Sequence, residues 1–253
     1  MTQKLSDKSF IYPDWHVPNY IKSFQTTRNG GFSKKEDYRS LNLSKNVGDD
    51  RNCVDLNLGQ IEKKIKNSLF FLSQNHGNEI IQLPQAQLNL NADAAYTKDN
   101  IQVCSVLTAD CLPILLTDTK GSFVAAIHAG WRGLGNGIIE NTVHTIRSPN
   151  DLIVWFGPCI SQEMLEVGPE VYSFFMQRDE NIKKAFIPKK NNKFLLSLTT
   201  AAQIKFINLD VKLLYGNGIT QKYCTFAQQD QFYSFRRNQK TGRMATMVWI
   251  DKN

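Results

Sequence analysis

The chain of 253 residues has few of the side chains that form disulfide frameworks or large metal clusters. It contains five cysteines and four histidines, and no Cys-x-x-Cys pair occurs. An odd number of widely spaced cysteines argues against a small disulfide-stapled fold and favours free thiols in a reducing compartment.

Long apolar runs and basic clusters are also missing. The N-terminal stretch "MTQKLSDKSFIYPDWHVPNY" lacks the apolar core of a signal peptide, and no uninterrupted apolar segment approaches the ~20 residues of a transmembrane helix. We therefore expect a cytoplasmic protein with no membrane partner. The net charge is +7, yet no run of Lys and Arg exceeds two residues, so we expect no nucleic-acid partner. A small anionic ligand would use the same positive field with fewer residues.

The apolar pattern predicts short strands in the middle of the chain and helices that alternate with strands later. Short apolar runs predict strands over 69–74, 80–83, 101–107, 112–118, 122–129, 152–158, 234–238 and 245–251. Apolar residues at helical spacing, together with propensity, predict helices over 51–68, 134–147, 170–177 and 198–209. This order indicates an α/β (α+β) fold in which mixed β-sheets pack between helices. Composition shifts nowhere sharply, so we expect a single domain over 1–253.

The stretch "TADCLPILLTDTKGSFVAAIHAGWRG" predicts a hairpin that brings a cysteine and a histidine together. "DTKG" is typical of a type I turn, and if Asp118 pairs with Gly121, Cys111 lies directly opposite His128. A three-residue loop would shift this register by one. A thiolate beside an imidazole suits zinc ligation or a Cys–His nucleophilic pair. The alternative is a buried cysteine beside a hydrogen-bonded histidine.

Elimination among the other histidines suggests a third ligand. His144 faces outward on its expected helix, and His16 has no visible partner in an N-terminal loop. His76 lies after an apolar run and before a glycine, which indicates a loop at a strand end. A set of one cysteine and two histidines leaves a fourth coordination position open for water or substrate, as catalytic zinc sites do.

The glycine-rich stretch "HAGWRGLGNG" follows the hairpin. A strand ends there and a helix begins, so backbone N–H groups favour an anion, and Arg132 could add a bidentate fork. The alternative is a tight turn with Arg132 in a surface salt bridge. The stretch is neither a Walker loop nor a dinucleotide fingerprint.

Several motifs together resemble the laccase-domain family, whose members are also labelled multicopper-polyphenol-oxidase-like and purine nucleoside phosphorylases. The resemblance runs from about residue 26 to 250 and rests on "SQNHGNEI", "NADAAYT", "TADCLPILLTD", "AAIHAGWRGLGNGI", "WFGPCIS", "LEVGPEV", "CTF" and "SFRRNQKTGRMATMVWI". Two departures are Asn238, where the family usually has Asp, and Leu165, where it usually has Tyr or Phe. They put substrate preference in more doubt than chemistry.

The resemblance implies a fold similar to the catalytic domain of the cytotoxic necrotizing factors. It implies that His76, Cys111 and His128 are the catalytic, metal-ligating residues, with zinc as the cofactor and copper as the alternative metal. Arg28 and Asn46 match loops of the family that line the site, and with Arg132 they are the expected substrate-binding residues.

The resemblance also implies phosphorolysis of adenosine, inosine and S-methyl-5′-thioadenosine together with adenosine deamination. The partners would be a nucleoside and phosphate, and a monomer or a homodimer both remain open. Asp110 and Asp93 are candidate proton carriers. Strand alternation points Asp110 away from the Cys111 face, which favours a structural role for that residue. Trp131, Phe32 and Phe226 could wall a purine slot, although a core role suits each of them better.

Three other functions remain open. The first is a metal-free Cys–His hydrolase or amidase that uses Cys111 as its nucleophile. The second is a role in the fidelity of peptidoglycan precursors, which some bacterial relatives suggest. The third, a copper polyphenol oxidase, is disfavoured because four histidines are too few for a trinuclear cluster plus a blue site.

Overall fold

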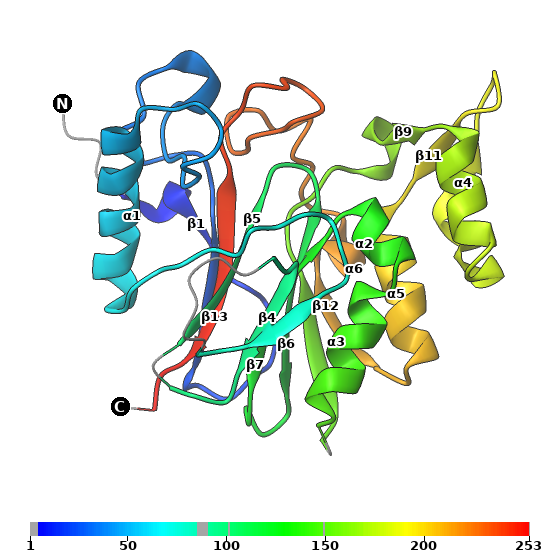
Figure 1. Ribbon diagram of the computed structural model, residues 1–253, viewed down its shortest axis with the longest axis horizontal. Coiled ribbons are helices and arrows are strands. Elements are labelled where there is room, and N and C mark those ends of the chain that lie inside the picture. The colour runs from blue at the N-terminus through cyan, green and yellow to red at the C-terminus, as the bar shows by residue number, and fades with distance from the viewer. Residues whose placement is uncertain (1–4, 85–90, 101, 149, 253) are drawn as a thin grey trace.

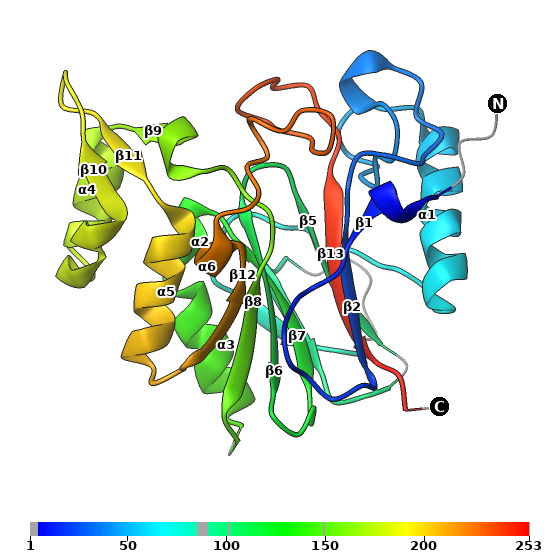
Figure 2. The same ribbon diagram turned by 180° about the vertical axis from the view of Figure 1, so that it is seen from behind.

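Two β-sheets stacked face to face form the centre of the molecule, with helices on both outer sides (Figures 1 and 2). The computed structural model describes residues 5–84, 91–100, 102–148 and 150–252. Within these ranges, none of the helices is long and apolar enough to cross a membrane. The mixed α/β fold expected from the sequence is confirmed.

The larger sheet has six strands and mixes parallel with antiparallel pairs. In spatial order they are β12 (Leu213–Gly216), β8 (Leu152–Phe156), β6 (Leu112–Asp118), β7 (Val124–Ala129), β4 (Ala94–Thr97) and β3 (Ile80–Gln82). Every residue of β6 and β7 is buried, because the sheet is covered on both faces. This explains why these strands are continuous apolar runs and do not alternate.

The second sheet has four antiparallel strands. They are β1 (Phe10–Ile11), β2 (Ile21–Thr26), β13 (Met244–Ile250) and β5 (Val103–Thr108). A small third sheet joins β10 (Phe186–Pro188), β11 (Phe194–Leu196) and β9 (Glu166–Val167).

Three apolar layers hold these parts together. Leu115 and Trp155 of the larger sheet pack against Val106 and Val248 of the four-stranded sheet. Helices α2 (Trp131–Gly135), α3 (Ile138–Ile146), α4 (Pro169–Met176) and α5 (Leu198–Asn208) contribute to the core on the outer side of the larger sheet. Helix α1 (Arg51–Ile65) covers the outer face of the four-stranded sheet, and the short α6 (Asn217–Thr220) follows β12. Burial on both faces makes the two sheets a rigid base for the loops at their ends.

Helix ends follow ordinary capping chemistry. The Asp50 side chain accepts hydrogen bonds from the backbone of Asn52 and Cys53, so α1 begins one residue later. Ser197 caps α5 in the same way, through the N–H of Thr200. The helix predicted over 134–147 is instead two helices, because Gly137 adopts a left-handed φ of 88° between them.

Two predicted strands are wrong. The segment 69–74 runs beside β5, but the Gln74 side chain takes the place of a backbone ladder by accepting from Leu107 N–H and donating to Leu107 O. The segment 234–238 turns sharply, because Ser234 Oγ and the Arg236 N–H both donate to the Asp110 carboxylate. β2 and β4 lie in stretches for which the sequence predicted no strand.

The predicted hairpin between β6 and β7 forms, but its register is wrong by two residues. Gly121 N–H does donate to Asp118 O, yet the ladder begins at Thr117 and Val124 and pairs Pro113 with His128. Asp118 Oδ1 also accepts from the N–H groups of Lys120 and Ser122, and these bonds stabilise a longer loop than a two-residue turn. Cys111 therefore precedes β6 and does not face His128 across the ladder.

Candidate metal centre

Three side chains from separate parts of the chain converge at one end of the stacked sheets. His76 lies in the loop before β3, Cys111 immediately before β6, and His128 near the end of β7. Their ligand atoms all lie within 4.8 Å of one another, with Cys111 Sγ 3.8 Å from His76 Nε2. Among the described residues this is the one group of three or more His, Cys, Asp or Glu side chains arranged to hold a metal ion.

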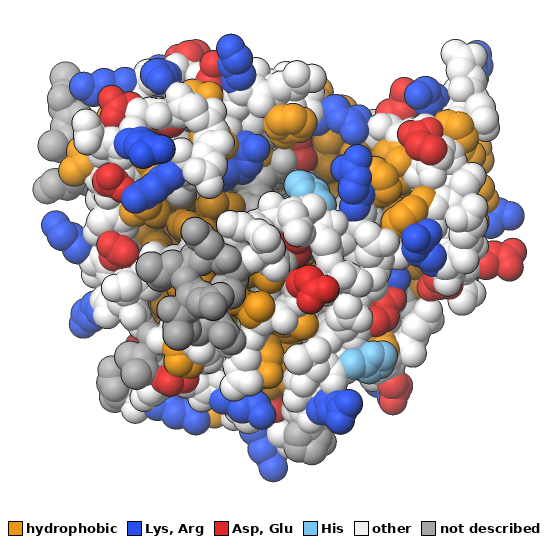
Figure 3. Space-filling model, viewed as in Figure 1, with side chains coloured by type: hydrophobic (Ala, Val, Ile, Leu, Met, Phe, Trp, Pro, Cys, Tyr) orange, Lys and Arg blue, Asp and Glu red, His pale blue; other side chains and the backbone are white. Residues whose placement is uncertain are grey.

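The three residues differ in their access to solvent. His128 is buried, Cys111 is half-buried and His76 is exposed. Figure 3 shows a histidine side chain near the centre of one face, in a hollow flanked by basic side chains. A ligand can therefore approach the centre from the His76 side, while His128 is fixed in the sheet.

A fully buried carboxylate, Asp93, organises two of the three groups. Asp93 Oδ1 lies 2.6 Å from His128 Nδ1, which leaves Nε2 of that ring free to face a metal. The same carboxylate accepts from the backbone N–H groups of Asn75, His76 and Gly77 at 3.2, 3.0 and 2.7 Å. It thereby holds the His76 loop, in which His76 has a left-handed φ of 62°.

A second carboxylate, Asp110, holds the Cys111 backbone. Asp110 has a φ of 93°, which an L-residue adopts only when its surroundings compensate for the strain. Its carboxylate accepts from Thr225 Oγ1 at 2.6 Å, Ser234 Oγ at 3.0 Å and Arg236 N–H at 2.6 Å. The role of Asp110 is therefore structural. All contacts of Asp93 are likewise used for positioning, so neither carboxylate is free to carry a proton to a substrate.

The charges of the group favour a thiolate. Burial raises the pKa of the Cys111 thiol, but His128 and His76 oppose that effect and lower the pKa to about 6. Burial lowers the pKa of His128, while Cys111 and Asp93 raise it to about 9. Both shifts favour a thiolate beside an imidazolium in the metal-free group, so a metal that binds here competes with a proton on His128.

The donor set and its spacing fit a zinc ion. Zn–S and Zn–N bonds of ~2.3 and ~2.0 Å at a tetrahedral angle separate the two donor atoms by about 3.5 Å. The observed separation of Cys111 Sγ and His76 Nε2 is 3.8 Å. The hydrogen bond from His128 to Asp93 is the carboxylate–histidine pairing that supports zinc ligands in proteins. Three ligands leave one position of a tetrahedron for water or substrate.

Gly130, the residue before α2, is packed against the centre. A Cβ atom at Gly130 would lie 2.9 Å from His76 Cδ2 and 3.1 Å from Cys111 Sγ. Gly133, one turn later, approaches Gly77 O in the same way, at 2.8 Å. The glycines after the hairpin are therefore needed for close packing of α2 on the His76 loop.

Replacing Gly130 by alanine is expected to displace His76 and Cys111 and to weaken zinc binding about 10–100-fold, the usual effect of disturbing the support of a metal ligand. Its backbone φ of −69° suits alanine, so the helix should still form. Competition with a fluorescent zinc chelator measures the affinity. Gly59→Ala is the matched control, because a Cβ there meets no atom within 4 Å. Equal affinities in both variants would show that the close approach of Gly130 is unimportant.

The three expected substrate-binding residues lie outside the convergent group. Arg132 is exposed on α2 and its guanidinium stacks on Trp131, 4.3 Å from the ring centroid. Arg28 donates to the carbonyl oxygens of Arg39 and Gln229 and so joins two loops. Asn46 is exposed, and its backbone N–H donates to Ser44 Oγ. In the described part of the chain, no hydrogen bond or ring contact joins any of the three to His76, Cys111 or His128.

Two of the three aromatic residues that were candidates for the walls of a purine slot pack against the core. Trp131 packs edge-on against Phe174 with ring centroids 5.6 Å apart, and Phe226 packs against the same core on the helix side of the larger sheet. The Phe32 N–H donates to Asn57 Oδ1. The core role that the sequence favoured for these residues is confirmed for Trp131 and Phe226.

Arg243 is a charged residue near the centre that the sequence interpretation did not select. It lies one residue before β13, and its N–H donates to Asn42 Oδ1. Burial lowers the pKa of Arg243, and the negative charges of Cys111 and Asp110 oppose this effect. A Gly-Arg pair directly before an apolar strand was the only signal in the sequence.

Comparisons with known proteins agree with this architecture. A family model described as "Multi-copper polyphenol oxidoreductase laccase" matches residues 22–251. A purine nucleoside phosphorylase of Haemophilus influenzae is 43% identical over 246 residues, which cover 95% of this chain and 99% of that protein. The purine nucleoside phosphorylase YfiH of Escherichia coli is 35% identical over 244 residues, covering 95% of this chain and 98% of that one.

Solved structures are similar over nearly the whole chain as well. A crystal structure of a Neisseria meningitidis protein of the DUF152 family superimposes with a TM-score of 0.90 and 35% identity, covering 96% of this chain and 99% of that chain. A Bacillus licheniformis protein named YfiH gives a TM-score of 0.88 at 25% identity and covers 98% of both chains. With a matching family model, relatives above 30% identity and a shared fold, this chain belongs to the laccase-like multi-copper polyphenol oxidoreductase family that includes the YfiH proteins.

Proposed function

We propose that this protein is a zinc-dependent purine nucleoside phosphorylase that acts on adenosine, inosine and S-methyl-5′-thioadenosine and also deaminates adenosine. The observation that carries the proposal is the convergence of His76, Cys111 and His128 with ligand atoms within 4.8 Å of one another. It is supported by relatives named purine nucleoside phosphorylases, which are 35–43% identical to this chain over most of their length.

Zinc suits the ligand set better than the copper in the name of the family. A bound zinc supplies a Lewis acid that polarises a ligand oxygen. A multicopper oxidase would need further ligands, but His144 is exposed on α3 and His16 lies against Tyr215, with ring centroids 5.5 Å apart. His16 and His144 therefore contribute no ligand to this centre. The chain lacks the additional histidine ligands that several copper ions would need for redox chemistry.

In phosphorolysis, a phosphate oxygen attacks C1′ of the ribose and the C1′–N9 bond breaks. The purine leaves with the electron pair of that bond and takes up a proton, and the other product is the sugar 1-phosphate. The residues of this chain that would hold the phosphate are the cations around the centre, first among them Arg132, which follows Gly130 by two residues. Helix α2 has only five residues, so its dipole adds little and the guanidinium is the main anion-binding group.

In deamination, water adds to C6 of adenosine and ammonia leaves, giving inosine. Asp93 fixes the ring of His128, and the exposed His76 lies on the solvent side of the centre, where the purine would enter. Arg28 and Asn46 would contact the sugar or phosphate from the neighbouring loops. The two reactions share the centre but differ in their need for phosphate.

Arg132→Ala is therefore expected to reduce phosphorolysis about 10–100-fold and to leave deamination within about twofold, because a charge-assisted bond to phosphate contributes ~1.5–3 kcal/mol. Initial rates of adenine and inosine formation at several phosphate concentrations measure both reactions. Arg178→Ala is the matched control, because Arg178 is also exposed and stacks on an aromatic ring, that of Phe174. An equal loss of both reactions would contradict the phosphate role of Arg132.

The thiolate–imidazolium form supports a second candidate, a metal-free hydrolase or amidase that uses Cys111 as its nucleophile. One experiment separates the two: elemental analysis of the purified protein beside a chromatographic assay of adenosine with and without phosphate, before and after metal removal. Stoichiometric zinc and metal-dependent release of adenine and ribose 1-phosphate support the phosphorylase. Full turnover by stripped protein would overturn the zinc role.

A further inference from the structure

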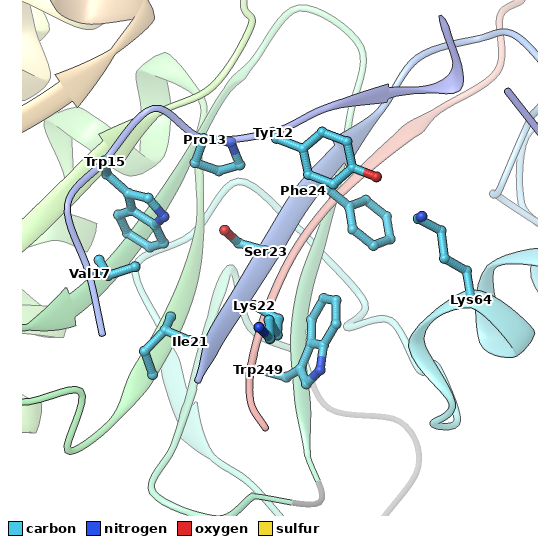
Figure 4. A pocket seen from close by; sticks show the side chains of 10 residues that line it. All are labelled: Tyr12, Pro13, Trp15, Val17, Ile21, Lys22, Ser23, Phe24, Lys64 and Trp249. Carbon is cyan, nitrogen blue, oxygen red and sulfur yellow. The ribbon is translucent and has the colours of Figure 1, made fainter. Parts of the chain in front are cut away.

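A trough on the edge of the four-stranded sheet is separate from the metal centre (Figure 4). It has a volume of about 370 Å³ and lies between the chain segment 12–17 and strand β2. That volume is within the range of small-molecule sites, and the trough shares no residue with the metal centre. The proposed phosphorylase chemistry uses none of its side chains.

The trough exists because β1 ends early. Phe10 pairs with Thr26 and Ile11 with Gln25, so the continuing register would set Pro13 opposite Ser23. Proline has no N–H, and the chain leaves the sheet at this point. Ile21 N–H donates to Pro18 O on the same edge, while Tyr20 O accepts from Asp251 on the opposite edge. By this alternation the backbone N–H and C=O of Ser23 point into the trough, and no hydrogen bond joins them to Pro13.

Aromatic side chains form the walls. Figure 4 shows Trp15 on one side of Ser23, with Phe24 and Trp249 on the other and Tyr12 above. Phe24 and Trp249 meet edge to face, with ring centroids 5.8 Å apart, and Tyr12 is 59% exposed at the rim. Trp15 and Phe24 are buried, so the aromatic surface that a ligand can reach comes from Tyr12 and the half-buried Trp249 beside the Ser23 backbone. Such a surface favours a flat ligand.

The charged side chains that line the trough are all basic. Lys22 and Lys64 line it, and no Asp or Glu does. Lys64 Nζ lies 4.5 Å from the ring centroid of Phe10 and 5.8 Å from that of Tyr12, so its ammonium is held over the rings at the open end. Lys22 Nζ donates to Asn19 O at 2.7 Å. Two cations without a lining carboxylate complement an anionic group.

We propose that this trough binds a planar aromatic molecule that carries an anionic group. The ring lies over Ser23 between Trp15 and Trp249, where the Ser23 N–H and C=O meet its polar edge. The anionic group lies against Lys64 at the open end. The site is independent of the metal centre and of the proposed phosphorylase activity.

The probe for this proposal is 2-naphthoate, measured by isothermal titration calorimetry on the zinc-loaded protein. We expect 2-naphthalenemethanol, which has the same ring without the charge, to bind at least tenfold more weakly. Lys64→Gln should weaken 2-naphthoate at least tenfold, and Lys64→Arg should restore most of the affinity. Lys63→Gln is the matched control, because Lys63 is exposed on the same helix but does not line the trough.

A second set of measurements locates the probe. Cys111→Ala should bind 2-naphthoate with unchanged affinity, and adenosine should not compete with it. The proposal is overturned by equal binding of the acid and the alcohol, by Lys64→Gln binding like Lys63→Gln, by competition with adenosine, or by no binding at millimolar probe. Cys111→Ala lacks one ligand of the metal centre, so binding of 2-naphthoate to this variant tests the trough alone. The outcome therefore does not depend on whether the protein is a phosphorylase.

Discussion

Cys111→Ala is expected to abolish stoichiometric zinc binding and to reduce adenosine turnover more than about 100-fold, because a ligand matters more than the groups that support it. The fold should survive. Cys111 lies before β6, whose residues Leu112–Asp118 are all buried through their own side chains. The circular dichroism spectrum and the melting temperature of the metal-free variant should therefore stay close to those of the metal-free wild type. Inductively coupled plasma analysis and a chromatographic assay measure metal and turnover.

Cys53→Ala is the control for this substitution, because Cys53 is a free, half-buried cysteine on α1, away from the metal centre. Iodoacetamide gives an independent readout. In metal-free wild type the low pKa of Cys111, about 6, should make it the cysteine that alkylates fastest at pH 7, and zinc should slow that reaction. A Cys111→Ala protein that turns over adenosine at the wild-type rate would rule out the proposed centre.

Asp93→Asn is expected to lower zinc affinity about 10–100-fold and also to destabilise the metal-free fold by about 3–5 kcal/mol. The carboxylate accepts from His128 Nδ1 and from three backbone N–H groups, and an amide cannot satisfy all four donors. Loss of the negative charge also removes one of the two influences that raise the pKa of His128. Urea unfolding in the presence of a chelator measures the stability, and Asp151→Asn, at an exposed loop position, is the control.

The stability difference between wild type and Asp93→Asn should depend on pH in one direction. Burial raises the pKa of Asp93, but the hydrogen bonds from His128, Gly77 and Asn75 prevail and lower it below its ordinary value of about 4. A carboxylate with a lowered pKa stabilises the fold above that ordinary value, and the contribution is lost as pH falls through the folded-state value. The difference should be full at pH 6 and shrink below pH 4. A difference that stays constant from pH 6 to pH 3 would contradict the charged role of Asp93.

Much of the candidate centre could be predicted from the sequence because the residue types that could form it, above all histidine, are rare in this chain. Only four histidines are present, so the choice of His76 and His128 followed from excluding two others. The exclusions agree with the structure, in which His144 is exposed and His16 lies against Tyr215. The strands β6 and β7 were also predictable, because burial on both faces demands continuous apolar runs.

The geometry of the centre was not predictable in the same way. The hairpin register depends on side-chain bonds of Asp118 to its own loop, and one such bond changes the pairing of every residue in the strand. Cys111 reaches the histidines only because Asp110 holds a left-handed conformation, stabilised by Thr225 and Ser234 more than a hundred residues away. Local patterns carry no information about partners at that separation.

The sequence by itself determined which atoms are available for the chemistry: one thiol, two imidazoles, glycines small enough to pack against them, and an α/β arrangement of apolar strands and helices. The tertiary structure decided how those atoms are aimed. The sequence left Asp93 as a candidate proton carrier and favoured a structural role for Asp110, and in the structure both carboxylates are buried and hold the segments that carry the ligands. The trough beside Ser23 likewise follows from one proline that ends a sheet edge. Residue types are set locally, whereas the direction of a side chain depends on hydrogen bonds that form only when distant segments meet.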